Sequence, residues 1–181
     1  MDDTTGLGAR LVVIRDNIVT LEVDAIVNAA NSTLLGGGGV DGAIHRAAGP
    51  QLLEECRSLK GCPPGQAKLT RGYRLPARYV IHTVGPVWAG GARGEAETLA
   101  RCYRNSLALA VQNGLRTLAF PAISCGVYGY PVDQAAQIAI DETANFLERD
   151  ARVDKIFLVC FGEAVYTAYV GAYTRRVPAR G

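Results

Sequence analysis

Four consecutive glycines, Gly36 to Gly39, constrain this chain more than any other feature of its sequence. They follow a short apolar run and precede a helical pattern that begins near Asp41. A turn without Cβ atoms lets backbone N–H groups approach a ligand closely, and the positive end of the following helix favours an anion. Because Asn28, Asn31 and Asp41 flank the glycines, we interpret the run as a phosphate-binding loop and not as a flexible linker.

A second glycine-rich segment, Ser124 to Tyr130, follows another apolar run and is ended by Pro131. In open α/β sheets the ligand lies beyond the carboxyl ends of the strands, so we expect both glycine segments at the ligand. Together they would hold the oxygens of one diphosphate. The simpler alternative is a pair of ordinary strand-to-helix turns.

Strand-length apolar runs alternate with helical patterns along the chain. The clearest helix is predicted from about Glu95 to Asn113, with Gly114 as its C-terminal stop, and another helix follows Pro131. Near-continuous apolar strands that alternate with helices indicate an α/β fold, in which a buried, mostly parallel sheet is covered on both faces. The predicted strands are Leu11–Ile14, Ala25–Val27, Ala67–Thr70, Tyr79–Val84, Thr117–Phe120 and Lys155–Cys160.

Length and composition predict one cytoplasmic domain that spans residues 1–181, with a short flexible N-terminus. The net charge of +2 and an arginine-rich tail that includes Arg175, Arg176 and Arg180 do not make a nucleic-acid footprint. Five cysteines without a Cys-x-x-Cys pair indicate reduced thiols, with neither a disulfide framework nor a zinc site. The acidic start, residues 1–5, lacks an apolar segment, and no run is long enough to span a membrane.

Several long segments, in the same order, resemble a macrodomain of the MacroD type, a module that binds ADP-ribose. The resemblance covers nearly the whole chain. It implies a three-layer α/β/α fold around a mostly parallel sheet of about six strands, and no cofactor or metal. The segments that carry it are Val23–Asn31, the run from Val27 to His45, Ala47–Pro50, His82–Trp88 and Phe120–Pro131.

The resemblance also implies roles for individual residues. Asn31 would hold the hydroxyls of the distal ribose, Tyr128 would cover that ribose, and Asp41 would orient or deprotonate a water. From the residues alone, Asp41 also suits the N-cap of its helix, and the diphosphate itself is another candidate for the base. The remaining residues expected at the ligand on this side are Asn28, Gly38, Gly39, Val40, Ser124, Cys125, Gly126 and Val127.

Adenine is expected toward the N-terminal strand, where the resemblance places Asn17 and Ile18. The family usually has aspartate at the position of Asn17. An amide oxygen still accepts a hydrogen bond from the adenine amino group, but without the assistance of a charge. Phe161 follows the last predicted strand and suits stacking on the base, with packing into the core as the alternative.

Cys125 stands where the family commonly has threonine. A cysteine near a helix N-terminus is a candidate nucleophile, and its base would have to be His45 or His82, the only histidines. His82 lies in an apolar run, which is typical of a core residue. His45 follows Asp41 by four residues, which predicts an i,i+4 contact between them. Because neither histidine is well placed as a base for Cys125, water activation is favoured over cysteine catalysis. Two distant histidines also make a poor zinc site, which disfavours metal catalysis.

These features predict a hydrolase of esters on the distal ribose of ADP-ribose, which deacetylates O-acetyl-ADP-ribose and removes mono-ADP-ribose from acidic side chains. The expected partners are ADP-ribose, its esters and mono-ADP-ribosylated proteins. The alternative is a reader that binds ADP-ribose without cleaving it, but readers commonly lack Asn31, Asp41 or both. Nucleic-acid binding is disfavoured, because aromatic and basic residues are not interleaved.

Overall fold

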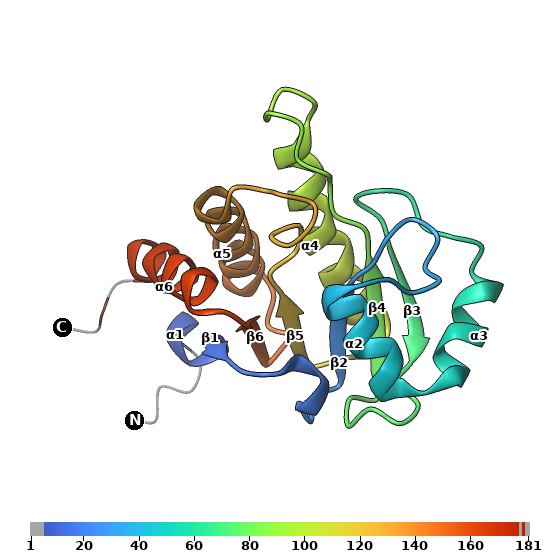
Figure 1. The fold of residues 1–181 in the computed structure, drawn as a ribbon. Helices are drawn as coiled ribbons and strands as arrows, with labels where there is room; N and C mark the ends of the chain where they lie inside the picture. Colours follow the sequence, from blue (N-terminus) through green and yellow to red (C-terminus); the bar gives the residue numbers. More distant parts are fainter. Residues whose placement is uncertain (1–5, 178, 180–181) are drawn as a thin grey trace.

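Six strands form one sheet in the order β1-β6-β5-β2-β4-β3 (Figure 1). All neighbouring strands are parallel except β3, which runs antiparallel to β4 at one edge. This computed structural model describes residues 6–177 and 179, so the acidic start and Arg180 lie outside the described residues. The strands are β1 (Leu11–Arg15), β2 (Ala25–Ala29), β3 (Ala67–Arg71), β4 (Tyr79–Thr83), β5 (Thr117–Pro121) and β6 (Lys155–Cys160).

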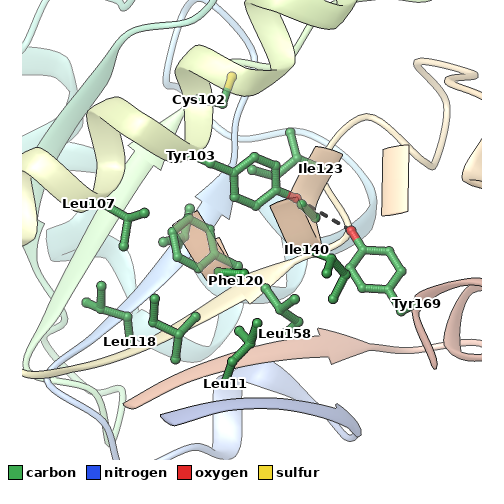
Figure 2. Close-up of a cluster of buried hydrophobic side chains, with 14 of the residues drawn as sticks. Leu11, Cys102, Tyr103, Leu107, Leu118, Phe120, Ile123, Ile140, Leu158 and Tyr169 are labelled. Atoms are coloured by element: carbon green, nitrogen blue, oxygen red, sulfur yellow. Dashed lines mark hydrogen bonds between the residues drawn. The ribbon is translucent and has the colours of Figure 1, made fainter. Parts of the chain in front are cut away.

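Successive strand residues pack on opposite faces of the sheet, because side chains alternate along a strand. Leu118 and Phe120 of β5 lie in one core, and Ala119 between them lies in the other. Figure 2 shows the first core, where the rings of Tyr103 and Phe120 have centroids 5.1 Å apart. Two apolar faces require helices on both sides of the sheet.

Helices α4 (Glu95–Gln112), α5 (Val132–Arg149) and α6 (Glu163–Arg176) cover one face, and α2 (Gly39–Ala48) and α3 (Pro50–Ser58) cover the other (Figure 1). The short helix α1 (Leu7–Arg10) precedes β1, and the 3-10 turn η1 (Ile18–Thr20) follows it. This three-layer α/β/α architecture confirms the predicted fold class. Within the described part of the chain, no helix is both long and apolar enough to cross a membrane.

The predicted boundaries agree with the structure to within two residues for every strand. The helix predicted to end at Asn113 ends at Gln112, and Gly114 follows it with φ of 66°. The sequence pattern does not predict α6, because only Tyr169 and Ala172 of this helix are buried and no apolar stripe marks it.

Candidate functional site

The two glycine segments leave the sheet from neighbouring strands. β2 and β5 pair in parallel at the centre of the sheet, so the chain segments that follow them start at the same edge. From this point the strand order runs through β4 to β3 on one side and through β6 to β1 on the other. Such a switch in strand order is where open α/β sheets bind ligands.

Both segments present an open backbone. A Cβ added to Gly38, Gly39 or Gly126 would meet no atom within 4 Å. Gly38 is the N-cap of α2, so the first N–H groups of this helix lie at its positive end. Leu34 and Ser124 adopt φ of 61° and 63°, a left-handed conformation that is uncommon for residues with side chains. Backbone strain of this kind gathers at ligand sites.

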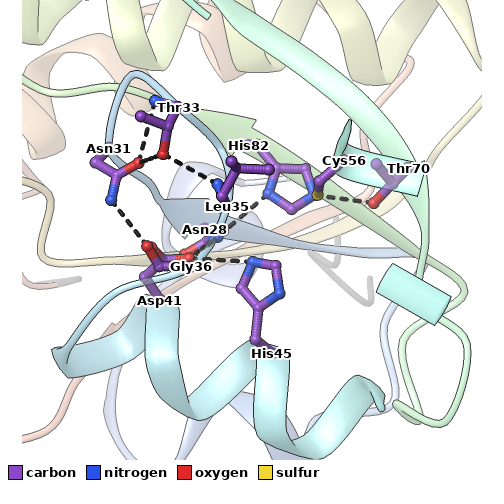
Figure 3. A network of polar contacts seen from close by, with 10 residues as sticks. All are labelled: Asn28, Asn31, Thr33, Leu35, Gly36, Asp41, His45, Cys56, Thr70 and His82. Atoms are coloured by element: carbon purple, nitrogen blue, oxygen red, sulfur yellow. Dashed lines mark hydrogen bonds and ion pairs between the residues drawn. The ribbon is translucent and has the colours of Figure 1, made fainter. Parts of the chain in front are cut away.

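Asp41 is buried in the first turn of α2, and two side chains approach one of its oxygens (Figure 3). The fully buried Asn28 donates from Nδ2 to Asp41 Oδ1 over 2.9 Å, and His45 Nε2 lies 3.4 Å from the same oxygen. The predicted i,i+4 contact is therefore confirmed. Asp41 Oδ2 faces the glycine loop, because a Cβ added to Gly37 would lie 3.2 Å from it.

Asn31 organises the first glycine segment. Its Oδ1 accepts from the N–H and the hydroxyl of Thr33, over 3.1 and 2.6 Å, and its Nδ2 donates to the carbonyl of Gly36 over 2.9 Å. The same Nδ2 lies 3.4 Å from the place of a Cβ on Gly37, the point that Asp41 Oδ2 also approaches. The side chains of Asn31 and Asp41 therefore converge on Gly37.

A row of buried polar side chains extends from Asp41 across the sheet (Figure 3). Asn28 and His82 are register partners on β2 and β4, and Asn28 Nδ2 lies 3.2 Å from His82 Nδ1. His82 Nε2 lies 2.9 Å from Thr70 Oγ1 on β3. Burial, with a contribution from His45, lowers the pKa of His82 to about 3, so the ring is neutral at physiological pH. His82 is a core residue with polar partners on both nitrogens, as predicted.

The second glycine segment is held by the chain that follows β4. Ser124 donates from Oγ to the carbonyl of Pro86 over 2.8 Å, and its own carbonyl accepts from the N–H of Tyr130 over 3.0 Å. A Cβ on Gly85 would lie 2.7 Å from Ile123 Cγ2, so only glycine lets the two segments pack this closely.

A buried carboxylate fixes the loop that follows β4. Glu95, at the start of α4 and 3% exposed, accepts hydrogen bonds from the N–H groups of Ala89, Gly91 and Arg93 over 3.0, 2.7 and 2.6 Å. Burial acts to raise the pKa of Glu95, but the backbone donors outweigh it and the pKa is lowered below its ordinary value. The carboxylate is therefore ionised and anchors the loop.

The Macro domain family matches residues 27–139 of this sequence. The chain belongs to the Macro domain family. A Macro domain-containing protein of Chlorobaculum tepidum is 62% identical over 156 residues, which are 86% of this chain and 91% of that protein. A Citrobacter rodentium protein named O-acetyl-ADP-ribose deacetylase is 52% identical over 174 residues, with 94% of this chain and 98% of that protein covered.

Solved macrodomain structures agree with the fold. The Oceanobacillus iheyensis macrodomain with ADP has a TM-score of 0.88 at 41% identity, with 91% of this chain and 90% of that chain covered. The Trypanosoma brucei macrodomain in complex with ADP-ribose has a TM-score of 0.87 at 48% identity, with 92% and 71% covered. The family inferred from sequence segments is confirmed.

The environment of Cys125 in this macrodomain disfavours a nucleophilic thiol. Burial raises the pKa of Cys125 to about 11, so the thiol stays protonated near neutral pH. Its Sγ lies 3.5 Å from the carbonyl oxygen of Ile123.

Within the described residues, no group of three or more histidine, cysteine, aspartate or glutamate side chains is arranged to hold a metal ion.

Of the three residues expected at adenine, Asn17 follows β1 and Phe161 follows the neighbouring strand β6. Asn17 caps η1, since its Oδ1 accepts from the N–H of Val19 over 3.3 Å, and Ile18 is buried beneath. Phe161 is 85% exposed, so the alternative that it packs into the core is wrong. An exposed phenylalanine has its ring available for stacking.

Large exposed apolar side chains gather along the same edge of the macrodomain. Each of four lies in the chain segment that follows the carboxyl end of a parallel strand, and exposed apolar surface commonly marks a binding site. Tyr128 lies half-buried beside one of them. The four are Leu35, Val87, Val127 and Phe161.

One hypothesis from the sequence is corrected by the geometry. The N-cap of α2 is Gly38, and Asp41 is the third residue of the helix, so the hypothesis that Asp41 serves as the cap is wrong. Sequence reasoning also missed Glu95 and Gly42. A Cβ on Gly42 would lie 2.5 Å from the carbonyl oxygen of Gly37. The only signal for either residue is local: an acidic residue after glycines, and one more glycine in a glycine-rich region.

Proposed function

We propose that this macrodomain binds ADP-ribose across its two glycine segments and hydrolyses esters on the distal ribose. The substrates would be O-acetyl-ADP-ribose and proteins that carry mono-ADP-ribose on acidic side chains. The convergence of Asp41 Oδ2 and Asn31 Nδ2 on Gly37 is the observation that carries this proposal. The name of the Citrobacter rodentium relative and the ligand of the Trypanosoma brucei structure agree with it.

Binding would use backbone groups more than side chains. The N–H groups at the start of α2, from Gly38 to Val40, and those of Ser124 to Val127 would donate to the diphosphate oxygens. Adenine would lie between the Asn17–Ile18 turn and the ring of Phe161, which are at the β1–β6 side of the same edge. The distal ribose would then lie near Asn31, with Tyr128 covering it.

Hydrolysis would need a water next to the ester carbonyl. Asp41 Oδ1 is occupied by Asn28, which leaves Oδ2 to take a proton as the water attacks the carbonyl carbon. The bond between the carbonyl carbon and the ribose oxygen then breaks, and Asp41 returns the proton to the departing ribose oxygen. Asn31 would hold a ribose hydroxyl through its second amide N–H. The diphosphate is the alternative base.

The decisive experiment offers O-acetyl-ADP-ribose and a protein with glutamate-linked mono-ADP-ribose, and measures released acetate and ADP-ribose. A protein with arginine-linked ADP-ribose is the matched control, because that linkage is not an ester and should survive. Retention of modified protein without release would contradict the hydrolase and favour the reader.

A further inference from the structure

We propose that His82 is a positioning residue for this hydrolysis: its ring, fixed by Thr70, orients the amide of Asn28 and through it the carboxylate of Asp41. The inference rests on the proposed function and extends it to residues that do not touch the substrate. It follows from the donor and acceptor pattern of the buried row in Figure 3.

The carboxylate decides which way the Asn28 amide faces. An ionised carboxylate only accepts hydrogen bonds, so Asn28 must present Nδ2 to Asp41 Oδ1, and the distance is 2.9 Å. The same Nδ2 lies 3.2 Å from His82 Nδ1. An amide N–H group and a ring nitrogen can bond only if the ring nitrogen carries a lone pair. His82 Nδ1 is therefore the acceptor, and Asn28 donates one hydrogen to each neighbour.

The proton of the neutral His82 ring then lies on Nε2. This Nε2–H donates to Thr70 Oγ1 over 2.9 Å. The Thr70 hydroxyl in turn donates a hydrogen bond to the carbonyl of Arg71 over 3.2 Å. Cys56 Sγ lies 3.8 Å from the same nitrogen, and burial raises the pKa of this thiol to about 11. From Asn28 through His82 to Thr70, each donor thus meets an acceptor.

The Asn28 amide depends on these two neighbours for its orientation. Asn28 is fully buried, and its Oδ1 has no hydrogen-bond partner among the described residues. A reversed amide would set its oxygen against Asp41 Oδ1 and against the lone pair of His82 Nδ1. The acceptor on His82 and the carboxylate therefore act together to hold the amide, and the amide in turn holds Asp41 Oδ1.

Thr70 offers the cleanest test, because three hydrogen bonds of the row separate it from Asp41. Thr70→Val keeps the shape but removes the acceptor for Nε2–H, while Thr70→Ser retains the hydroxyl. We expect kcat for O-acetyl-ADP-ribose to fall by roughly 10-fold or more in Thr70→Val and to recover in Thr70→Ser, with the Kd for ADP-ribose changed by less than about twofold.

Thr143→Val is the matched control. Thr143 is also fully buried, and its hydroxyl donates to the carbonyl of Ala139 within α5, so its loss removes an equivalent group away from the site. Its turnover should equal that of the wild type. If Thr70→Val lowers the melting temperature but keeps the wild-type kcat, Thr70 is only structural and the proposal is overturned.

A nitrogen-15 NMR spectrum of the histidine rings tests the inference without relying on activity. The chain has two histidines, so His45→Gln assigns the signals of His82. We expect the Nε2–H tautomer in the wild type and a shift toward Nδ1–H in Thr70→Val. An Nδ1–H ring in the wild type overturns the positioning role. If the wild type binds ADP-ribose but cleaves no ester, the hydrolase proposal fails, and the tautomer still decides whether the row orients Asn28.

Discussion

Trp88 donates its backbone N–H to the carbonyl oxygen of Tyr128 over 2.7 Å, and this bond joins the loop after β4 to the second glycine segment. The Trp88 ring also packs on Tyr130, with centroids 4.7 Å apart. Because the residues after Trp88 are anchored by Glu95, the buried carboxylate supports the position of Tyr128 through the loop. Tyr128, which we propose covers the distal ribose, is therefore held in place by the anchored loop.

Glu95→Gln should therefore weaken ADP-ribose binding. The amide of glutamine accepts with only one oxygen, and its NH₂ group would face a backbone N–H that the carboxylate now satisfies. We expect the Kd measured by calorimetry to rise by roughly 3- to 10-fold, in line with the loss of one or two hydrogen bonds. Glu97→Gln is the control, since Glu97 lies exposed in the same helical turn and pairs with Arg104. Equal affinities of the two variants for ADP-ribose would show that the Glu95 carboxylate does not support binding through the loop.

Glu95 also predicts how stability depends on acid. Its pKa in the folded protein lies below the ordinary value of 4.5, so the carboxylate stabilises the fold fully above pH 4.5 and loses this effect as the pH falls through the lower folded pKa. The melting temperature of the wild type should therefore approach that of Glu95→Gln as the pH drops below 4.5. Melting curves of both proteins measure this difference. A gap that stays constant down to about pH 3 would contradict the assignment.

Gly42→Ala should displace the first glycine segment. An added Cβ would lie 2.5 Å from the carbonyl oxygen of Gly37, and backbone must move to relieve this contact. We expect a loss of about 1–3 kcal/mol in the free energy of unfolding and an ADP-ribose Kd at least several-fold higher. Gly171→Ala, within α6, is the control: its Cβ would meet Arg175 Nη1 at an ordinary 3.5 Å, so stability should hold or rise. Similar effects of both substitutions would show that the close approach of Gly42 to Gly37 does not shape the first glycine segment.

The sequence predicts the features whose cause is local. Four glycines before Asp41 indicate a phosphate loop at a helix start, and each strand shows as a short apolar run, because both signals arise from neighbouring residues. The helix that ends at Gln112 is equally local, since Gly114 stops it. These elements place the glycine segments at one edge of a parallel sheet.

The sequence does not predict features that depend on contacts between distant segments. Glu95 binds a loop that supports Tyr128, and Thr70 meets His82 only because β3 pairs with β4 in the antiparallel direction. Asn28 Oδ1 has no hydrogen-bond partner among the described residues, and this too depends on how the strands and α2 pack together. Such roles come from the assembled sheet, and no spacing along the chain marks them.

Cys125→Thr should keep ester hydrolysis. The pKa of about 11 leaves the Cys125 thiol protonated, and the family commonly carries threonine there, so the substitution keeps the shape of the phosphate segment. We expect kcat within about twofold of the wild type, measured as released acetate. A thiol reagent would not decide the question, because a bulky adduct would block the segment. Collapse of turnover in a folded Cys125→Thr protein would instead support a nucleophilic cysteine.

Asp41→Asn separates catalysis from binding. The oxygen of the introduced amide can still accept from Asn28 Nδ2, and the N-cap of α2 is Gly38, so the fold and the glycine loop should persist. The substitution removes the charge and the proton acceptor at Oδ2, so turnover of O-acetyl-ADP-ribose should fall by roughly 10²- to 10⁴-fold. The Kd for ADP-ribose should hold or fall slightly, because a negative charge near the diphosphate is lost.

Asp141→Asn is the control for Asp41→Asn, because Asp141 accepts from Gln137 on α5 and takes no part in the site. The paired measurement is kcat for ester cleavage beside the ADP-ribose Kd, with a melting curve for each protein. If Asp41→Asn keeps the wild-type turnover, Asp41 Oδ2 is not the base. The diphosphate of the substrate would then be the leading candidate to activate the water, since the thiol of Cys125 stays protonated and His82 is held within the core.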